Sequence, residues 1–143
     1  MENIVVREFT RYEVEQVLAL YRSVGWSAYF AEPHKLRQAF GNSLSVFGAY
    51  ADGRLVGLIR TVGDGVSVVF IQDVLVEPAH QRQGIGRRLV AAVLARYPQV
   101  RQIHLMTDDL PETVGFYQSV GFTPVEQIPF RAFTRLRYET GIQ

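Results

Sequence analysis

The feature that most constrains this chain is a β-rich run that leads through a short polar loop into an amphipathic helix. Residues 66–76 are rich in Val, Ile and Phe, a composition typical of a strand. After a turn at 77–80, the loop 81–86 opens into a segment in which Ile85, Leu89 and Val93 recur at helical spacing. Pro98 ends that segment, so the pattern predicts a strand, a loop and then a helix over 84–97.

The rest of the chain predicts an α/β (α+β) fold, in which a mixed, mostly antiparallel central sheet of six to seven strands is flanked by about four helices. Asp52 and Gly53 separate two strand-like runs and predict a hairpin. Thr10 and Glu13 have the spacing of a capping box before a helix. We expect one domain over 1–143, with strands also at 4–6, 44–51, 55–62, 103–106 and 130–138 and helices at 11–24, 33–40 and 111–119.

Composition and charge exclude several classes of protein. The 143 residues include no cysteine, which rules out a disulfide framework, a thiolate zinc site and a cysteine nucleophile. A formal net charge of +1 argues against a nucleic-acid partner, which needs a clustered basic surface. No apolar run approaches the roughly 20 residues of a membrane helix, and the first residues do not resemble a signal peptide. We expect a cytoplasmic protein with no metal and no membrane partner.

The loop 81–86 has the properties of an anion-binding site. The first amides of a helix lack intrahelical partners, and the helix dipole adds partial positive charge there. Gly84 and Gly86 allow a ligand to approach the backbone closely. Positive charge comes from three arginines, Arg82, Arg87 and Arg88. A phosphate or pyrophosphate would fit this cradle, although a glycine pair before a helix can also be only a tight turn. Walker A and Rossmann loops are excluded, because the loop has no Gly-Lys-Ser/Thr and position 89 is not glycine.

Two segments resemble motifs of one known family, the GCN5-related N-acetyltransferases (GNAT). Gln81, Gly84 and Gly86 have the spacing of its Gln/Arg-x-x-Gly-x-Gly/Ala signature, and the preceding 73–78 is similar to the strand before that loop. About thirty residues downstream, 115–122 resembles the second motif, an aromatic-Tyr helix end followed by Gly-Phe. The resemblance spans nearly the whole chain. It implies the acyl-CoA N-acyltransferase fold and transfer of an acetyl group from acetyl-CoA to a primary amine.

The resemblance also implies which residues bind the coenzyme. The backbone of Val74, Leu75 and Val76 would pair with the pantetheine arm as an added strand. The pyrophosphate would be held by Gln81, Arg82, Gln83, Gly84, Ile85, Gly86 and Arg87. The second motif would contribute Thr113, Phe116 and Tyr117. Many family members have an asparagine seven residues before the tyrosine, and this chain has Leu110 there, so that contact is lost or made differently.

Tyr117 is the catalytic acid that the resemblance implies. It would stand near the sulfur and protonate the departing thiolate. This role suits a phenol, whose ordinary pKa near 10 keeps it protonated at neutral pH, next to a thiol with an ordinary pKa near 8.5. The alternative is a packing aromatic whose hydroxyl has another hydrogen-bond partner.

The residue that takes the proton of the amine has several candidates. Asp73 would share a strand face with apolar residues, so it is either a catalytic base or a buried structural carboxylate, and both interpretations stay open. His34 is a weaker base candidate. We expect His104 in the core and His80 in solvent.

Aromatic residues after the first helix are candidates for binding the acceptor amine. Trp26, Tyr29 and Phe30 could line a pocket for an aromatic or apolar amine, or they could simply cover the sheet edge and the core. The segment 20–26 and the strand 73–76 are similar to a branch that includes plant and cyanobacterial arylalkylamine acetyltransferases. We expect a small-molecule amine acceptor, with a protein or peptide acceptor and a non-catalytic coenzyme-binding module as alternatives. A homodimer stays open.

Overall fold

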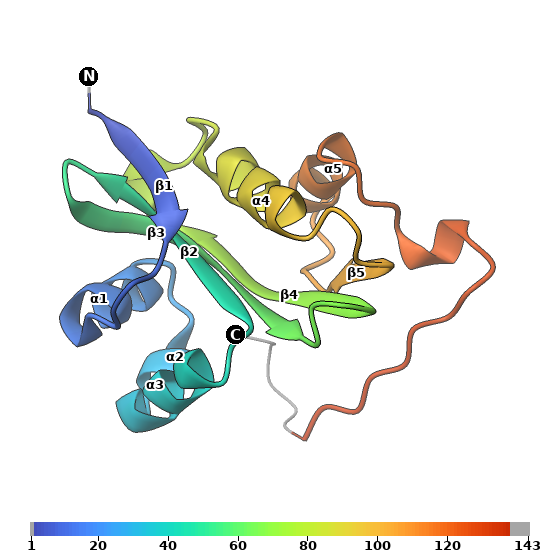
Figure 1. Ribbon diagram of the computed structural model, residues 1–143, viewed down its shortest axis with the longest axis horizontal. Helices are drawn as coiled ribbons and strands as arrows, with labels where there is room; N and C mark the ends of the chain where they lie inside the picture. The colour runs from blue at the N-terminus through green and yellow to red at the C-terminus, as the bar shows by residue number, and fades with distance from the viewer. Residues whose placement is uncertain (1, 138–143) are drawn as a thin grey trace. The chain divides into compact units, whose positions relative to one another are not determined.

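A five-stranded sheet forms the centre of the first part of the chain (Figure 1). The computed structural model describes residues 2–137, and the chain divides after Met106 into two units. The elements of the first unit are β1 (Ile4–Glu8), α1 (Val14–Ser23), α2 (Ser27–Phe30), α3 (Pro33–Gly41), β2 (Ser45–Ala51), β3 (Arg54–Gly63), β4 (Val68–Val76), α4 (Ile85–Arg96) and β5 (Gln102–Leu105). A 3-10 turn, η1 (Pro78–His80), lies between β4 and α4.

The sheet is mixed and mostly antiparallel, as predicted from the order of the elements. Its strands lie in the order β1-β2-β3-β4-β5, and only the pairing of β4 with β5 is parallel among the described strands. Asp52 and Gly53 form the turn between β2 and β3, with φ angles of 49° and 87°. Two-residue hairpin turns need this left-handed backbone, which explains the predictive value of the Asp-Gly pair.

A β-bulge in β4 marks the place where this strand separates from β5. Arg60 of β3 lies opposite Asp73 and Thr61 lies opposite Ile71, so Gln72 is an extra residue in β4. The pairing with β5 ends at the same point, because Ile71 is the last residue of β4 that β5 reaches. Beyond Ile71, no described residue gives β4 a strand partner on that edge. The last residues of β4 therefore present an open edge.

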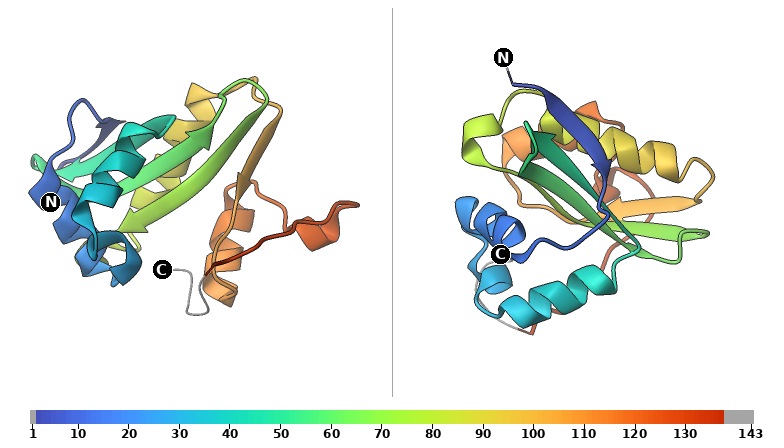
Figure 2. Two further views of the ribbon diagram at one scale, coloured as in Figure 1. Left: turned by 90° about the horizontal axis from the view of Figure 1, so that it is seen from below. Right: turned by 60° about the vertical axis from the view of Figure 1, so that its left-hand side comes forward.

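Helices cover both faces of this sheet (Figures 1 and 2). α4 lies on one face and buries Ile85, Leu89, Val90 and Val93. α1, α2 and α3 lie on the other face. There, apolar side chains of α1 and α3 form a core with residues of the sheet; its largest members are Leu18, Leu20, Tyr21, Leu36, Phe40, Leu55, Leu58 and Leu75. Burial from both sides fixes the end of β4 and the start of α4, and thus the loop between them.

The second unit contains α5 (Pro111–Ser119) and a 3-10 turn, η2 (Val125–Gln127). α5 has the predicted bounds, with Pro111 in its first turn, where a missing N–H does no harm. The backbone after α5 turns at Gly121, whose φ is 100°, and Phe122 N–H donates a hydrogen bond of 3.0 Å to Tyr117 O. These contacts and the rings around it hold Tyr117 in the last turn of α5.

Several local predictions were wrong. The described residues form five strands, fewer than the six to seven expected, because 130–137 adopt no strand and position 138 lies outside the described residues. A strand-like composition does not make a strand unless another strand pairs with it. The capping box at Thr10 is also absent, since α1 begins at Val14 with no side-chain cap. The aromatic segment without a clear period forms a short helix, α2, and brings the α-helices of the described chain to five.

Candidate active site

The open edge of β4 and the loop after it form a continuous backbone surface. Val74 and Val76 are half-buried and Leu75 is buried, so these residues keep β4 in the sheet while its outer edge stays without a strand partner in the described chain. Backbone N–H and C=O groups on such an edge can pair with an added extended segment. The edge is therefore suited to a ligand with alternating amide donors and acceptors.

The loop that follows has the backbone geometry of an anion cradle. Arg82 and Gly84 both adopt left-handed conformations, with φ angles of 64° and 81°. Gly84 is the N-cap of α4 and offers no side chain to its amides. The first hydrogen bond of the helix runs from Arg88 N–H to Gly84 O at 3.1 Å, so the preceding amides have no acceptor within the helix. Left-handed residues beside such amides make a concave, anion-attracting backbone.

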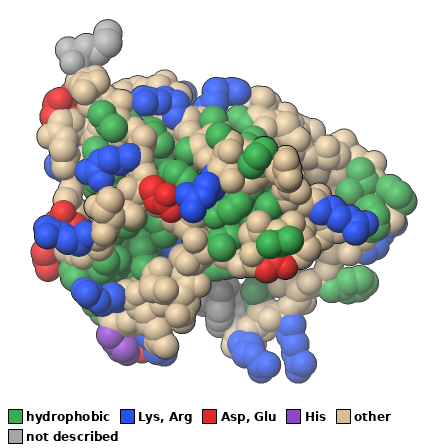
Figure 3. Space-filling model, viewed as in Figure 1, with side chains coloured by type: hydrophobic (Ala, Val, Ile, Leu, Met, Phe, Trp, Pro, Cys, Tyr) green, Lys and Arg blue, Asp and Glu red, His purple; other side chains and the backbone are tan. Residues whose placement is uncertain are grey.

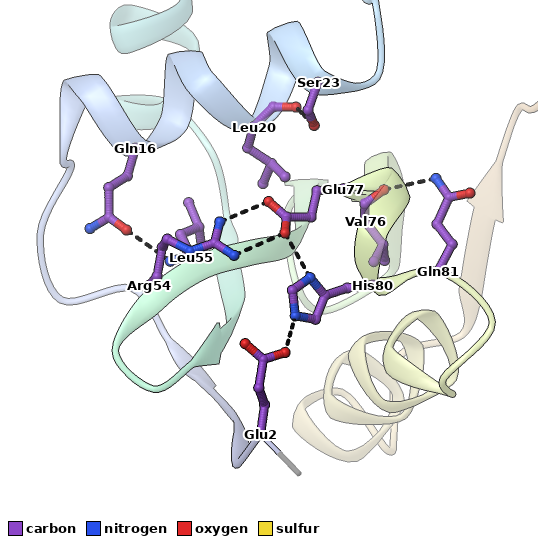
Figure 4. Close-up of polar contacts among 10 residues, drawn as sticks. All are labelled: Glu2, Gln16, Leu20, Ser23, Arg54, Leu55, Val76, Glu77, His80 and Gln81. Carbon is purple, nitrogen blue, oxygen red and sulfur yellow. Dashed lines mark hydrogen bonds and ion pairs between the residues drawn. The ribbon is translucent and has the colours of Figure 1, made fainter.

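Side chains at both ends tie this loop to the sheet, and Figure 4 shows the first of them, Gln81. Gln81 Nε2 donates a hydrogen bond of 2.9 Å to the carbonyl of Val76. Arg88 donates one of 3.1 Å to the carbonyl of Ile4 in β1, so this arginine is engaged with the protein rather than directed at a ligand as the sequence suggested. The other loop residues that were predicted to bind the coenzyme differ in exposure. Arg82, Gln83 and Arg87 are exposed, Gly86 is half-buried and Ile85 is buried.

Asp73 lies at the centre of a buried hydrogen-bond network. Its side chain is fully covered, and it forms an ion pair with Arg60, whose Nε donates to Asp73 Oδ2 at 2.7 Å. Tyr21 donates to the same oxygen at 2.8 Å, and Tyr29 donates to Oδ1 at 2.7 Å. Three donors from α1, α2 and β3 thus converge on one carboxylate of β4.

This environment favours the structural interpretation of Asp73 over that of a catalytic base. Three of the roughly four lone pairs of this carboxylate accept hydrogen bonds, its side chain is covered, and its charge is balanced by Arg60. Burial, followed by the neighbouring Asp73 carboxylate, raises the pKa of Tyr21 well above its usual value and that of Tyr29 to about 12. Both phenols therefore stay protonated and keep donating to Asp73 at neutral pH.

The predicted acceptor residues lie beside this network. Trp26, Tyr29 and Phe30 are half-buried and pack against the core on the α1 side of the sheet. The ring of Tyr29 lies 5.0 Å from that of Tyr21 and 5.8 Å from that of Trp26. These side chains thus cover the core, as one interpretation of the sequence had it, and they also leave part of each ring accessible. Tyr29 connects this aromatic group to Asp73.

In the second unit, Tyr117 is half-buried between two aromatic neighbours. Its ring centroid lies 5.0 Å from that of Phe116 and 6.1 Å from that of Phe122. Burial and, to a smaller extent, the Asp108 carboxylate raise the pKa of Tyr117 to about 12. Thr113 is four residues earlier in α5 and therefore on the same side of the helix. A phenol with so high a pKa can donate a proton or a hydrogen bond at neutral pH but cannot serve as a base.

The burial predicted from the sequence was wrong for two of the three histidines, His80 and His104. His80 is buried, with 5% exposure, rather than solvated, because both of its ring nitrogens lie against carboxylates. His104 is exposed rather than in the core, because the four-residue β5 turns this side chain outward at the edge of the sheet. His34 is exposed on α3.

Sequence analysis missed two residues of the Asp73 network, Arg60 and Tyr21. Arg60 interrupts the apolar run of β3, and a charge inside a buried strand requires an opposite charge nearby. That signal predicts an opposite charge near Arg60, but it does not identify the residue that carries the charge. Tyr21 carried no such signal, because a tyrosine at helical spacing is an ordinary core residue.

A cavity of about 260 Å³ lies outside this region. It is lined by residues of β1, β2 and the start of α1, including Arg7, Gln16 and Tyr50. None of the residues predicted to bind the coenzyme or the acceptor lines it. The cavity therefore takes no part in the candidate site.

The charges on the face shown in Figure 3 are interspersed. In the view of Figure 3, Lys and Arg side chains are spread over the molecule and several lie beside Asp or Glu. This pattern differs from the continuous basic surface that sequence-independent nucleic-acid binding uses. Among the described residues, no three His, Asp or Glu side chains gather as metal ligands would. No helix in the described part of the chain has the length and apolar character needed to cross a bilayer.

Replacing Asp73 by Asn tests the structural role of the network. The variant leaves the buried Arg60 guanidinium without its counter-charge, and breaking a buried ion pair in this way costs about 3–5 kcal/mol. We expect the free energy of unfolding, measured by urea denaturation, to fall by that amount. Asp52→Asn is the matched control, since Asp52 is exposed and the change should stay within about 0.5 kcal/mol. Equal stability of the two variants would contradict the structural role.

Known proteins resemble this chain in both sequence and fold. The sequence model of the Acetyltransferase (GNAT) domain matches residues 9–136. A GNAT-family acetyltransferase from Streptococcus pneumoniae is 36% identical, with a TM-score of 0.85 over 96% of this chain and 100% of that one.

Two curated relatives come from a cyanobacterium and a plant. A ycf52-like N-acetyltransferase of Prochlorococcus marinus is 34% identical over 124 residues, which are 82% of this chain and 65% of that protein. The chloroplastic serotonin N-acetyltransferase 2 of Oryza sativa is 32% identical over 142 residues, which are 94% of this chain and 69% of that protein. The chain thus spans about two thirds of the length of these relatives. With the family model matched from Phe9 to Leu136, the chain belongs to the GNAT acetyltransferase family.

Proposed function

We propose that this protein transfers the acetyl group of acetyl-CoA to a primary amine of a small molecule. The observation that carries the proposal is the open edge of β4, which runs directly into a loop with left-handed Arg82 and Gly84 at the start of α4. Acetyl-CoA has an extended arm with amide groups, which matches the strand edge, and a pyrophosphate, which matches the loop. We also propose that both units belong to one acetyltransferase domain, in keeping with a family match that runs through both.

Coenzyme binding would use backbone groups more than side chains. The amides of the pantetheine arm would pair with the edge of β4 at Val74 and Val76, as an added strand does. The pyrophosphate would accept hydrogen bonds from the loop amides at the start of α4, where the helix dipole is favourable. The exposed side chains of Arg82 and Arg87 add positive charge at the same loop. This division explains why glycines are needed where the phosphates approach.

The proposed reaction is a direct attack of the amine on the thioester. The amine nitrogen forms a bond with the acetyl carbonyl carbon, the carbon–sulfur bond breaks, and coenzyme A leaves as a thiolate that takes up a proton. Tyr117 would donate to the leaving sulfur. Since the pKa of Tyr117 is about 12, well above the ordinary 8.5 of a thiol, its main contribution would be hydrogen-bond stabilisation of the thiolate as it forms.

The amine must lose a proton during this reaction. Asp73 is a poor candidate to accept it, because Tyr21, Tyr29 and Arg60 occupy the carboxylate. We propose that the proton leaves through water instead. Asp73 would then act by holding Tyr29 in place beside the acceptor, with the phenol oxygen of Tyr29 available to accept a hydrogen bond from the amine.

An arylalkylamine is the acceptor class that we propose. Trp26, Tyr29 and Phe30 present partly accessible rings that can stack on an aromatic amine and attract a protonated one. A relative that is 32% identical over 94% of this chain is named for serotonin, which supports the same class.

Binding of acetyl-CoA tests the coenzyme site. At about 100 times its dissociation constant, a ligand of the folded state adds about 2.7 kcal/mol, so we expect the melting temperature to rise by about 5–10 °C. Gly84→Ala should weaken binding about 5- to 30-fold, because a left-handed alanine costs about 1–2 kcal/mol and the exposed loop would relax out of the binding conformation. Calorimetry measures both affinities.

Gly41→Ala is the control for this substitution. Gly41 ends α3 and an added methyl group meets no atom there, so affinity should be unchanged. The coenzyme site would be refuted by a wild-type protein whose melting temperature does not respond to millimolar acetyl-CoA.

Tyr117→Phe tests the role of the phenol. Removing one hydrogen-bond donor to the charge that develops in the transition state costs about 100- to 1,000-fold in kcat, so kcat should fall by at least 100-fold while the dissociation constant of acetyl-CoA changes little. Tyr97→Phe, at the C-terminal end of α4, is a control that should leave both unchanged. Release of coenzyme A thiol measures the rate, and a Tyr117→Phe enzyme with wild-type kcat would remove Tyr117 from the mechanism.

A panel of amines tests the acceptor. We expect arylalkylamines to give a higher kcat/KM than polyamines, aminoglycosides and short peptides. Trp26→Ala should lower kcat/KM for an arylalkylamine by about 2- to 30-fold, the range of a cation–π contact of 0.5–2 kcal/mol, and should affect an aliphatic amine less. A preference for peptides would favour protein acetylation instead, and coenzyme binding without turnover of any amine would favour a binding module.

A further inference from the structure

A buried histidine immediately before the coenzyme loop bridges two carboxylates (Figure 4). Nδ1 of His80 lies 2.6 Å from Glu77 Oε2, and its Nε2 lies 2.5 Å from Glu2 Oε1. Glu77 also accepts two hydrogen bonds from Arg54 of β3, at 2.9 and 3.1 Å. The His80 side chain is 6% exposed, so water can replace few of these contacts. We call Glu2, Arg54, Glu77 and His80 the His80 cluster.

The His80 cluster fastens one end of the coenzyme loop to the N-terminal strand. His80 is the last residue of η1 and directly precedes Gln81. Glu2 lies just before β1, and the other end of the loop is fastened to the same strand by Arg88, which donates to Ile4 O. A backbone hydrogen bond of 2.8 Å, from Glu77 N–H to Val56 O, also attaches this segment to β3. Left-handed Arg82 and Gly84 thus lie between two anchors.

We propose that His80 is a positioning residue for acetyl-CoA binding, which holds the loop 81–86 in its anion-binding conformation by bridging Glu2 and Glu77 as a cation. This inference rests on the proposed function of the loop. His80 touches no coenzyme atom in the proposal. It acts through the start of the loop, and its effect therefore falls on coenzyme affinity rather than on the chemical step.

The protonation state of His80 decides how many of its two contacts are hydrogen bonds. An imidazolium has two N–H donors and can donate to Glu2 and Glu77 together, whereas a neutral imidazole has one and leaves a carboxylate without a donor. The hydrogen bond with Glu2 and then that with Glu77 raise the pKa of His80 above 6.5, against the effect of burial. Arg54 is the remaining charged member of the cluster, and its hydrogen bonds lower the pKa of Glu77.

The direction of the pH effect follows from this shift. Since the pKa of His80 is higher in the folded protein than the ordinary 6.5, the stabilisation from the bridging cation is fully present below about pH 6.5 and is lost as the pH rises through the folded value. The loop should therefore be held most firmly at mildly acidic pH. Coenzyme affinity should decline on the alkaline side.

The test compares the wild type with His80→Gln between pH 6 and 8.5. Calorimetry gives the dissociation constant of acetyl-CoA, and the ratio of the two constants cancels the titration of the coenzyme's own phosphate, which has a pKa near 6. We expect the ratio to be about 5–10 at pH 6 and to approach 1 at pH 8.5. The value of kcat at saturating substrates should differ less than twofold. His104→Gln, which changes an exposed histidine on β5, should match the wild type throughout.

Two readouts need no ligand. Amide hydrogen exchange of residues 81–88, corrected for intrinsic rates, should be faster in His80→Gln than in His104→Gln at pH 6. NMR titration should place the pKa of His80 above 6.5 in the wild type and lower in Glu2→Gln, a variant at a side chain that is 51% exposed and therefore safe for folding. Glu2→Gln covers the case in which His80→Gln does not fold.

The outcomes separate this inference from the proposed function. A constant affinity ratio across pH, or loop exchange that is the same in both variants, overturns the positioning role even if acetyl-CoA binds well. A protein that binds no acetyl-CoA, but whose loop exchange still follows His80, overturns the coenzyme site and keeps the positioning of the loop. A loss of melting temperature in His80→Gln without a pH-dependent affinity ratio assigns His80 to stability alone and also overturns the inference.

Discussion

The buried ion pair between Asp73 and Arg60 is the interaction on which the rest of this structure depends. It joins the two central strands, β3 and β4, at the β-bulge of Gln72, and the hydroxyls of Tyr21 and Tyr29 attach α1 and α2 to the same carboxylate. Buried charges are tolerated only when they are paired and hydrogen-bonded, so every donor of this network has to be present at once. The network therefore specifies how the helices meet the sheet.

The bulge and the ion pair together explain why the site forms where it does. β4 leaves β5 after Ile71, and a strand that loses a neighbour would be free to bend or fray. The paired charges hold Asp73, the second residue past that point, in register with β3. β4 therefore stays paired with β3 as far as Val76 while its outer edge is open. The open edge of β4 and the position of Tyr29 thus both depend on one buried contact, since Tyr29 donates to the same carboxylate.

Local features of this protein could be predicted from its sequence, whereas long-range pairings could not. The strand, loop and helix around Gly84 follow from periodicity and from the need for glycine at a left-handed position, and both are properties of neighbouring residues. Arg60 and Asp73, in contrast, each violate an apolar pattern without naming a partner thirteen residues away. His80 was expected in solvent because it lies in a loop, and that prediction failed because one of its two partners, Glu2, is 78 residues away in the sequence. The strand at 130–138 failed for a related reason, since a strand needs a second segment.

This difference also separates the two halves of the candidate site. The proposed coenzyme half is built from backbone groups, whose positions depend on φ angles and helix starts, and such positions leave a short sequence signature. The proposed acceptor half is built from side chains of Trp26 and α2 that pack on the core, and of these Tyr29 donates a hydrogen bond to Asp73. A change at Trp26 could alter the acceptor without disturbing the coenzyme loop. Under the proposed function, one coenzyme-binding scaffold could therefore serve different amines, and the information about the acceptor would lie in Trp26, Tyr29 and Phe30 rather than in the loop.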